Sequence, residues 1–349
     1  MASFSRLFST SKTPFIHYRV TENLYADCLK ARNVSRKDCT ADAIYEKTGV
    51  GIKTFVDNPL QKIAEFNDLR PKYSSLHGKE LAEAISEYRN CRIETTMRSY
   101  GLVKMIYHYI VREPGKVKLF ECPMNSIDIK RIRIIKETTK KIVFTDGIEE
   151  YEFMFSKSTL FKRFSLSKPF YEFNISIISD PIKALEGYLS GTKTSIVEDK
   201  VFGLPVEKNQ LIIPLYSETN KGGCIIYPKS GLNIWNARGR KRDPNEVYIP
   251  YPAKIKKQHP NFFPPRDVKW DLCLPNGKHI SMKICQDNEK AIMSDPNKAL
   301  GKWLLRDVLN LPEGQILTYD HLLKVGINSV IFTKEDKTHF SVDFLEFDE

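Results

Sequence analysis

The chain has 349 residues, of which 41% are hydrophobic and 28% charged, and its formal net charge is +11. This length fits two domains of ordinary size, and the composition excludes a disordered or collagen-like protein. The excess of positive charge favours a polyanionic partner, either nucleic acid or an anionic membrane surface. No apolar run approaches the roughly 20 residues needed to span a bilayer, so we expect no membrane protein.

The seven cysteines are scattered along the chain, with no Cys-x-x-Cys pair and no cluster with histidine. We therefore expect neither a zinc module nor a disulfide framework. Free thiols of this kind are typical of a reducing cytoplasm.

The N-terminal part is expected to mix helices and strands. The spacing of apolar residues predicts three helices, at residues 16–30, Leu60–Phe66 and Gly78–Tyr88. Cys39–Val56 predicts two strands around a glycine-containing turn. Cys91–Tyr109 mixes basic residues with tyrosines and is consistent with an amphipathic helix in the core or in a dimer, or with a segment that flanks DNA.

From Lys116 to Phe155 the chain changes to short β-branched runs, divided at Asp146–Gly147 by a hairpin signal. Ser190–Glu207 shows no clear period. It is the expected boundary between a domain of residues 1–195 and a domain of residues 208–349.

The second half of the chain is expected to be mostly strands. Residues 270–284 alternate on both sides of an Asn-Gly turn, a strong hairpin signal. One helix is predicted to begin at Asp295–Pro296, because aspartate is a good cap and proline suits the first helical position. Its apolar stripe is Leu300, Trp303, Leu304 and Val308, so Trp303 is expected in the core.

The stretch GRKRDPNEVYIP, residues 239–250, places three consecutive basic residues in an expected turn. Between Asn236 and Lys257 the chain carries seven lysines and arginines against only Asp243 and Glu246. Lysine and arginine anchor phosphates, and arginine, asparagine and glutamate can also read base edges in the major groove. Charge alone is equally typical of a solvated loop.

Two passages around this turn, GLNIWNARGRKRDPNEVYIPYP and QDNEKAIMSDPNKALGKWLLRDVL, resemble the C-terminal domain of restriction endonucleases of the NgoFVII and BfiI type. The resemblance covers roughly residues 211–347. That domain is similar to the plant B3 DNA-binding domain, an open β pseudo-barrel of seven strands with two arms that grip the major groove of double-stranded DNA. The resemblance implies a first arm at Trp235–Glu246 and a second arm at residues 286–294.

The resemblance makes side chains in and beside these arms the candidate DNA contacts. They are Trp235, Asn236, Arg238, Arg240, Lys241, Arg242, Asn245, Glu246, Gln286, Asp287, Lys290, Ser294 and Lys298. The arginines can contact guanine in bidentate fashion, and Asn236 or Gln286 can contact adenine. Glu246 and Asp287 would either accept from cytosine or hold a neighbouring arginine in place. The lysines suit phosphates, which makes affinity salt-dependent.

The first half of the chain carries a second resemblance. Ten residues separate Asp42 from Lys53 in the expected hairpin. This pattern resembles a PD-(D/E)xK nuclease, in which a hairpin brings the aspartate beside the lysine strand. The position two before the lysine, an acid in that family, is Gly51.

Some members of that family carry the second carboxylate on a following helix. The resemblance then implies that Asp42 and Glu65 hold Mg²⁺, with Gln61 one turn before Glu65 and Glu22 as an accessory acid on the preceding helix. Lys53 would activate water or stabilise the charge that develops on the phosphate.

Two other sites remain open. Glu46–Lys47 is a rival acid and base, although it falls in an expected turn. His77 and Lys79 resemble part of the HxKxxxxD motif of metal-independent, phospholipase-D-like nucleases, in which the histidine is the nucleophile. The position of the motif's aspartate is Ala84, and an exposed helix start also explains the pair.

Together the resemblances imply a type II restriction endonuclease of a bacterial or archaeal cytoplasm. Its fold class would be α+β, with an N-terminal α/β nuclease domain and a C-terminal pseudo-barrel. Cleavage of both DNA strands requires two active sites, so we expect a homodimer. The alternative is a sequence-specific DNA-binding protein without nuclease activity.

Overall fold

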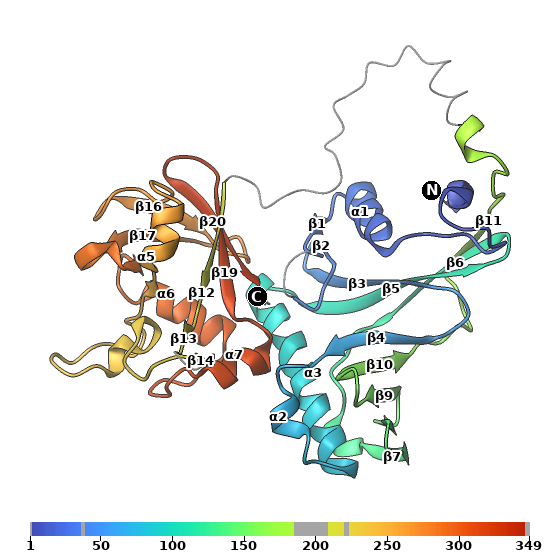
Figure 1. Ribbon diagram of the computed structural model, residues 1–349, viewed down its shortest axis with the longest axis horizontal. Helices are drawn as coiled ribbons and strands as arrows, with labels where there is room; N and C mark the ends of the chain where they lie inside the picture. The colour runs from blue at the N-terminus through green and yellow to red at the C-terminus, as the bar shows by residue number, and fades with distance from the viewer. Residues whose placement is uncertain (1, 36–38, 185–208, 220–222, 346–349) are drawn as a thin grey trace. The chain divides into compact units, whose positions relative to one another are not determined.

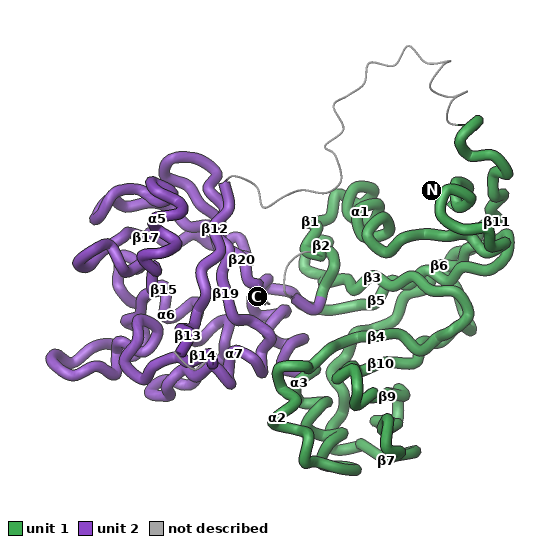
Figure 2. Tube along the Cα trace, viewed as in Figure 1, with its two compact units in different colours: residues 1–35, 41–89, 103–204 green, residues 36–40, 90–102, 205–349 purple. Residues whose placement is uncertain are grey.

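The computed structural model describes residues 2–35, 39–184, 209–219 and 223–345 (Figure 1). The chain divides into a first unit of residues 1–35, 41–89 and 103–204, and a second unit of residues 36–40, 90–102 and 205–349 (Figure 2). Both helices and sheets are present, as the expected α+β class requires. The expected boundary Ser190–Glu207 lies outside the described residues.

The larger sheet of the first unit has six strands in the order β1-β2-β3-β5-β6-β11. Its strands are β1 (Arg32–Asn33), β2 (Ala43–Tyr45), β3 (Thr48–Phe55), β5 (Lys104–Glu113), β6 (Lys116–Pro123) and β11 (Tyr171–Asn174). Neighbours are antiparallel except β3 and β5, which run parallel. A parallel pair needs a long crossover, which β4 (Leu60–Glu65), α2 (Arg70–Tyr73) and α3 (Gly78–Tyr100) provide.

Helix α1 (Tyr18–Leu29) confirms the helix expected at residues 16–30. The His17 side chain caps it by accepting from the Arg19 amide, and Lys30 ends it in the left-handed conformation. Tyr25 of α1 packs on a small core made by Ala43, Val50 and Ile52 of β2 and β3. One face of the β2–β3 hairpin is therefore fixed against α1.

The hairpin expected within Cys39–Val56 is present as β2 and β3. Its turn is Glu46–Lys47, which lies in the expected turn, with Glu46 in the left-handed region at φ 52°, but these two turn residues are not glycines. The glycines instead lie inside β3, where they are buried.

The second sheet of the first unit has five strands in the order β4-β10-β9-β8-β7. Besides β4, these are β7 (Arg133–Glu137), β8 (Lys141–Thr145), β9 (Glu150–Met154) and β10 (Thr159–Arg163). The Asp146–Gly147 signal forms the β8–β9 hairpin, as expected. The expected helix at Leu60–Phe66 is wrong, because β4 pairs with β10 over its whole length and this cross-strand pairing outweighs the local apolar spacing.

Helix α3 runs to Tyr100, well beyond the Tyr88 end that its sequence predicts. It stops at Gly101, which has a φ of 65°, and the Leu102 amide closes the end by donating to the Met97 carbonyl. The segment Cys91–Tyr109 is therefore part helix and part strand β5. Residues 90–102 belong to the second unit.

The second unit is built on a seven-stranded sheet in the order β12-β19-β20-β16-β17-β18-β15. Its strands are β12 (Gln210–Pro214), β15 (Ile249–Pro250), β16 (Lys269–Cys273), β17 (His279–Cys285), β18 (Ala291–Ser294), β19 (Ser329–Lys334) and β20 (His339–Leu345). Only β16 and β20 pair in parallel within the described part of this sheet. The sheet is open, with β12 and β15 at its edges, which is consistent with the expected seven-stranded open pseudo-barrel. A two-stranded ladder adds β13 (Ser217–Glu218) and β14 (Cys224–Ile225).

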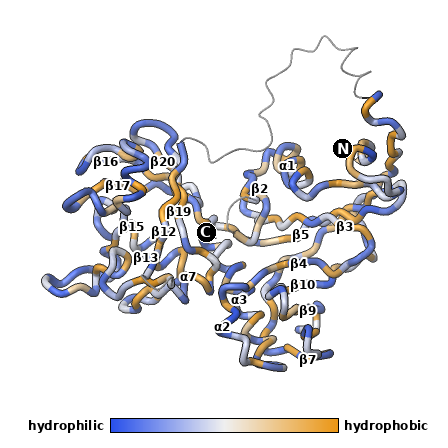
Figure 3. Tube along the Cα trace, viewed as in Figure 1, coloured by the Kyte–Doolittle hydropathy of each residue, from blue (hydrophilic) through white to orange (hydrophobic). Residues whose placement is uncertain are grey.

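The core of the second unit is rich in aromatic residues. Trp270 packs on Phe263 and Phe340, and Trp303 stacks on Phe344 with 5.6 Å between ring centroids. The expected core position of Trp303 is confirmed, since the residue is 3% exposed. Strand β19 carries a hydrophobic stretch, Val330, Ile331 and Phe332, followed by Thr333 and Lys334, and Figure 3 colours the strand hydrophobic in part.

The helices of the second unit are short. Besides the end of α3 and two 3₁₀ helices, the described ones are α5 (Ala253–Gln258), α6 (Ala299–Gly301), the π-helix η5 (Lys302–Val308) and α7 (Tyr319–Val325). The helix predicted from Asp295–Pro296 begins only at Ala299. The Asp295 carboxylate pairs with Lys269 at 2.8 Å and is not a cap, and Ser294 accepts from the Leu300 amide instead.

Candidate nuclease and DNA-binding sites

Asp42 lies just before β2, and its carboxylate completes the hydrogen bonding of β3. The pairing of β2 with β3 ends at the pair Ala43–Val50. The next amide on that side, Ile52 N–H, donates to Asp42 Oδ2 at 2.6 Å. The side chain of Asp42 is thereby fixed beside Lys53, the residue after Ile52, as the PD-(D/E)xK resemblance requires.

Three charged side chains interact at this point: Glu22 of α1, Asp42 and Lys53. Burial raises the pKa of Asp42, and the nearby Lys53 charge partly offsets this. Burial also raises the pKa of Glu22, and the charge of Asp42 raises it further. Arg19 pairs with Glu22 at 3.2 Å and acts in the opposite direction. Two acids with raised pKa values beside a lysine form an electrostatic cluster of the kind that catalytic sites use.

Gly51 stands at the position where the nuclease family carries an acid, and its surroundings are closely packed. A Cβ there would lie 2.6 Å from the methyl of Met124 and 3.2 Å from the Tyr107 ring. A side chain there would require the flexible Met124 side chain to move and the Tyr107 ring to shift slightly. Any second metal-binding acid must come from elsewhere in the chain.

Glu65 and Gln61, the expected displaced acid and its companion, lie in strand β4 and not in a helix. The Glu65 carboxylate accepts from Lys62 and from Asn67, and Gln61 donates to the Asn58 carbonyl at 2.7 Å. Among the described residues, Glu22 is the acid whose pKa responds to Asp42. The structure thus brings Glu22, Asp42 and Lys53 together and places the other two candidates in the second sheet.

The two rival sites, Glu46–Lys47 and His77 with Lys79, lie in a turn and at a helix start. Glu46–Lys47 forms the β2–β3 turn. His77 is exposed just before α3 and approaches Glu137 at 3.9 Å, and Lys79 pairs with Glu83 at 3.6 Å. Ala84 stands where the HxKxxxxD motif has its aspartate, and neither of these two contacts involves an aspartate.

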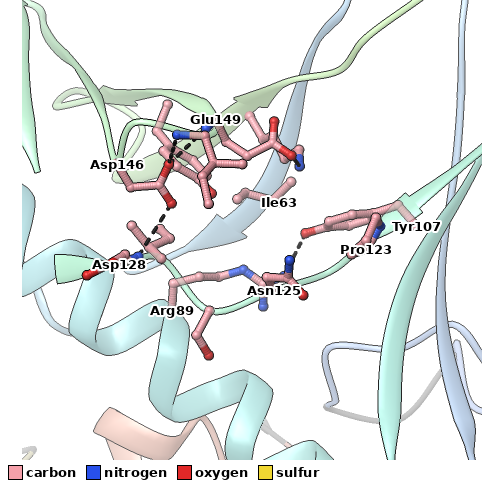
Figure 4. Close-up of a pocket in the computed structure, with 13 residues that line it drawn as sticks. Ile63, Arg89, Tyr107, Pro123, Asn125, Asp128, Asp146 and Glu149 are labelled. Atoms are coloured by element: carbon pink, nitrogen blue, oxygen red, sulfur yellow. Dashed lines mark hydrogen bonds and ion pairs between the residues drawn. The ribbon is translucent and has the colours of Figure 1, made fainter. Parts of the chain in front are cut away.

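A cavity of about 40 Å³ lies elsewhere in the first unit (Figure 4). Asp146 accepts there from the amides of Ile148 and Glu149 in the β8–β9 turn. Arg89 donates to the Tyr107 hydroxyl at 2.7 Å, and Lys162 pairs with Glu149 at 2.5 Å. The cavity holds only water-sized molecules and its charges serve the fold, so it is not our candidate active site.

The first arm leaves the second unit after the 3₁₀ helix η3 (Gly231–Asn236) as a projecting loop, drawn in yellow in Figure 1. Trp235 packs on the core of the unit, while Asn236 is exposed and donates to the Pro228 carbonyl. Arg238 and Lys241 are exposed and make no side-chain bond to any residue that the structure describes. Gly239 between them has a φ of 117°, which only glycine adopts readily.

Arg240 and Arg242 share one carboxylate. Glu246 is buried, and both of its oxygens accept from Arg240, while the Nε of Arg242 lies 3.7 Å from it. Of the two expected roles of Glu246, the structure shows that of holding arginines. The Arg240 side chain remains 60% exposed, so its guanidinium is oriented and still accessible.

Asn245 and Ser294, two further candidates, are buried. The amide of Asn245 bonds to Asp243 and Glu313 and accepts from Arg306. The hydroxyl of Ser294 bonds to the Pro296 carbonyl and the Leu300 amide. Their side-chain hydrogen-bonding groups therefore bond within the fold and stabilise the arms.

The second arm follows β17 and has an unusual backbone. Gln286, Asn288 and Glu289 have φ values of 68°, 58° and 54°. Such conformations are unfavourable for residues other than glycine. Lys256 of α5 stabilises the loop by donating to the Asn288 carbonyl at 2.7 Å and pairing with Glu289 at 3.2 Å.

The other candidates near the second arm are on the surface. Asp287 is exposed and lies 3.9 Å from Arg266, which gives it a weak pairing. Lys290 is exposed, and Lys298 pairs with Asp243 of the first arm at 3.7 Å. Sequence reasoning missed Lys256 and Arg306 as supports of the arms, because their partners are mostly backbone carbonyls that no sequence pattern marks.

Residues 208–336 match the family described as the NgoFVII C-terminal B3-like DNA-binding domain. The second unit thus carries a restriction-enzyme-associated DNA-binding domain, and DNA is its partner class. No curated protein matches the chain. The residues before 208 lie outside the family match.

Three further findings concern the described residues. No helix among them is long and apolar enough to cross a membrane. No group of three or more histidine, cysteine, aspartate or glutamate side chains in the described ranges could by itself hold a metal ion. None of the seven cysteines, all of which the structure describes, is in a disulfide bond.

Proposed function

We propose that the chain is a type II restriction endonuclease that hydrolyses phosphodiester bonds in double-stranded DNA at a specific sequence. The observation that carries this is the Glu22–Asp42–Lys53 cluster on the β2–β3 hairpin, in a chain whose second unit matches a restriction-enzyme DNA-binding domain. The hairpin arrangement supports the resemblance to PD-(D/E)xK nucleases. Binding alone would not need a buried acid pair beside a lysine.

The residues present fit a Mg²⁺ ion. Burial raises the pKa values of both carboxylates, and the charge of Asp42 raises that of Glu22 further, so a cation between them would be favoured. Mg²⁺ usually takes one or two protein carboxylates and completes its shell with water and phosphate oxygens, so a larger cluster is not required. We assign the ligands to Asp42 and Glu22, in place of the pair Asp42 and Glu65 that the sequence favours.

In the proposed hydrolysis, water adds to the phosphorus and the bond to the leaving oxygen breaks, so that one DNA end carries the phosphate and the other a hydroxyl. Mg²⁺, when bound, polarises the phosphate and lowers the pKa of the attacking water. Lys53 stabilises the negative charge that develops on the phosphate. Asp42 is held for this by the Ile52 amide, and Glu22 by Arg19.

The two arms of the second unit supply sequence recognition. Arg238, Arg240 and Lys241 form the accessible tip of the first arm, and Gln286, Asp287 and Lys290 lie on the second. Arginine is suited to guanine and lysine to phosphate. Cleavage of both strands requires two active sites, so we propose that the chain acts as a homodimer.

Digestion of phage DNA by the purified protein, with Mg²⁺ and with EDTA, tests this function. We expect discrete fragments with Mg²⁺ only. Cleavage that persists in EDTA would assign the chemistry to His77 and Lys79. A specific gel shift without cleavage under either condition would leave a DNA-binding protein without nuclease activity.

Variants distinguish the two metal assignments. Glu22→Gln is expected to lower the cleavage rate by at least about 100-fold, the usual scale for loss of a catalytic group, while Glu65→Gln stays near wild type. Asp57→Asn, in the exposed turn after β3, is the matched control for loss of one carboxylate. The reverse pattern, with Glu65→Gln inactive and Glu22→Gln active, would favour Asp42 and Glu65 as the ligands.

A further inference from the structure

Arg306 lies on η5, outside both arms, yet its guanidinium grips the base of the first arm. Its Nε donates to Asn245 Oδ1 at 2.8 Å and its Nη2 donates to the Pro244 carbonyl at 2.9 Å. Its Nη1 donates to the carbonyls of Leu311 and Pro312 at 2.6 and 2.8 Å. One side chain thus joins the arm, the π-helix and the loop that follows it.

The arm base also touches the preceding helix directly. A Cβ on Gly301 of α6 would lie 2.1 Å from the Asn245 carbonyl oxygen, so only glycine permits this approach. Asn245 itself is 4% exposed, and its amide donates to Glu313 at 3.1 Å. The base of the first arm and the α6–η5 helix therefore pack as one body, while the arm tip projects from it.

The same helix follows the second arm in the chain. Strand β18 ends at Ser294, whose hydroxyl accepts from the Leu300 amide at 2.8 Å at the start of α6. Lys298, just before α6, reaches Asp243 of the first arm at 3.7 Å. The α6–η5 helix therefore connects the two arms, the second through the chain and the first through Arg306, Gly301 and Lys298.

We propose that Arg306 is a positioning residue for sequence discrimination. It fixes the first arm relative to the second so that both read the same site, and it does so without contacting DNA. The inference rests on the proposed recognition of DNA by the two arms. Arginine is needed because its planar fork donates to four acceptors in fixed directions, which a lysine ammonium cannot do. Readout of base edges tolerates placement errors of only about 0.5 Å.

The test uses a library of duplexes with a randomised central segment. Sequences enriched by the full-length wild-type protein define the selected site, and affinity is then measured for that site and for the unselected library at several salt concentrations. Arg306→Lys keeps the charge but loses most of the hydrogen bonds. We expect it to reduce the preference for the selected site about tenfold, the scale of one misread base pair. Affinity for the unselected library and its salt dependence should stay within about twofold of wild type.

Two further variants separate positioning from charge and from folding. Lys302→Gln removes one positive charge from the exposed face of the same helix and should keep the wild-type preference. Asn245→Ala breaks the same contact from the arm side. The double variant, Arg306→Lys with Asn245→Ala, should lose no more of the preference than the more affected single variant. The reason is that both substitutions act through one interaction.

Three results would overturn the inference. Wild-type preference in Arg306→Lys would show that the clamp does not set specificity. An equal loss of affinity for the selected site and the library would make Arg306 a general stabilising or charge-bearing residue. Failure of the wild-type protein itself to enrich any sequence would overturn the proposed function, and this inference with it.

Discussion

Glu246 shows how a buried acid can prepare exposed arginines for recognition. Its carboxylate is 11% exposed and pairs with Arg240, whose side chain is 60% exposed. A guanidinium held in this way loses less conformational freedom when it meets a base. The arm tip is thus preorganised where it is most accessible.

Arg240→Ala should therefore weaken binding to the selected site by about 1–3 kcal/mol if Arg240 reads a guanine. Binding to unselected duplexes should change much less. Gel-shift titration against both DNAs measures the difference. An equal loss on both DNAs would show that Arg240 holds a phosphate and reads no base.

His321 gives the second unit a defined pH dependence. Burial lowers its pKa from the ordinary value of 6.5, and its Nε2 donates to the Leu309 carbonyl at 2.8 Å. Lys324 and Arg98 lower this pKa further. Protonation of the His321 ring is therefore less favourable in the folded state than in the unfolded chain.

The stability contributed by His321 is present above pH 6.5 and is lost as pH falls through the lower pKa of the folded state. His321→Gln keeps a donor for Leu309 but cannot titrate. In urea unfolding at pH 7 and pH 5, the wild type should lose more free energy of unfolding than His321→Gln. Equal losses in both proteins would contradict the assignment.

At the scale of elements, helix α3 supplies part of the second unit. Tyr100, at its end, donates its hydroxyl to Asp343 of β20 at 2.5 Å, and both residues are buried. Arg98 donates to the Val308 carbonyl at the end of η5. The second unit therefore includes a helix far from it in sequence.

Tyr100→Phe should lower the free energy of unfolding of the second unit by about 1–3 kcal/mol, because it removes one donor from a buried carboxylate. Urea unfolding followed by tryptophan fluorescence suits the measurement, since all three tryptophans, Trp235, Trp270 and Trp303, lie in this unit. An unchanged transition would show that Asp343 is satisfied by its other neighbours.

Elements with strong local signals could be predicted from the sequence. The Asn276–Gly277 and Asp146–Gly147 turns and helix α1 are of this kind, because turn chemistry and the spacing of apolar residues act over a few residues. Strand β4 has the apolar spacing of a helix, and only its pairing with β10 decides its conformation. The late start of α6 depends on ion pairs of Asp295 with Lys269 and Lys283, which are distant in sequence.

The candidate site was predictable only in part for the same reason. Asp42 and Lys53 lie on one hairpin, so their spacing indicates their proximity. Glu22 comes from a helix packed on the sheet, and its coupling to Asp42 is a tertiary property. The approach of Met124 to Gly51 is equally invisible in the sequence.

For the whole molecule, the net charge of +11 leads us to expect that affinity for DNA falls as salt rises. Removal of one lysine that binds a phosphate should reduce the slope of log affinity against log salt by about one. Lys241→Ala, at the exposed tip of the first arm, should show this reduction for selected and unselected duplexes alike. An unchanged slope would place Lys241 away from the phosphates.

The division of labour between a cleaving unit and a recognising unit is the central claim. It is tested most directly by comparing wild-type protein and Asp42→Asn on the same phage DNA with Mg²⁺, by sequencing fragment ends and by footprinting. The wild type should yield ends that share one sequence, and Asp42→Asn should leave the DNA intact while protecting that sequence. Cleavage by Asp42→Asn, or loss of both cleavage and protection, would contradict the account.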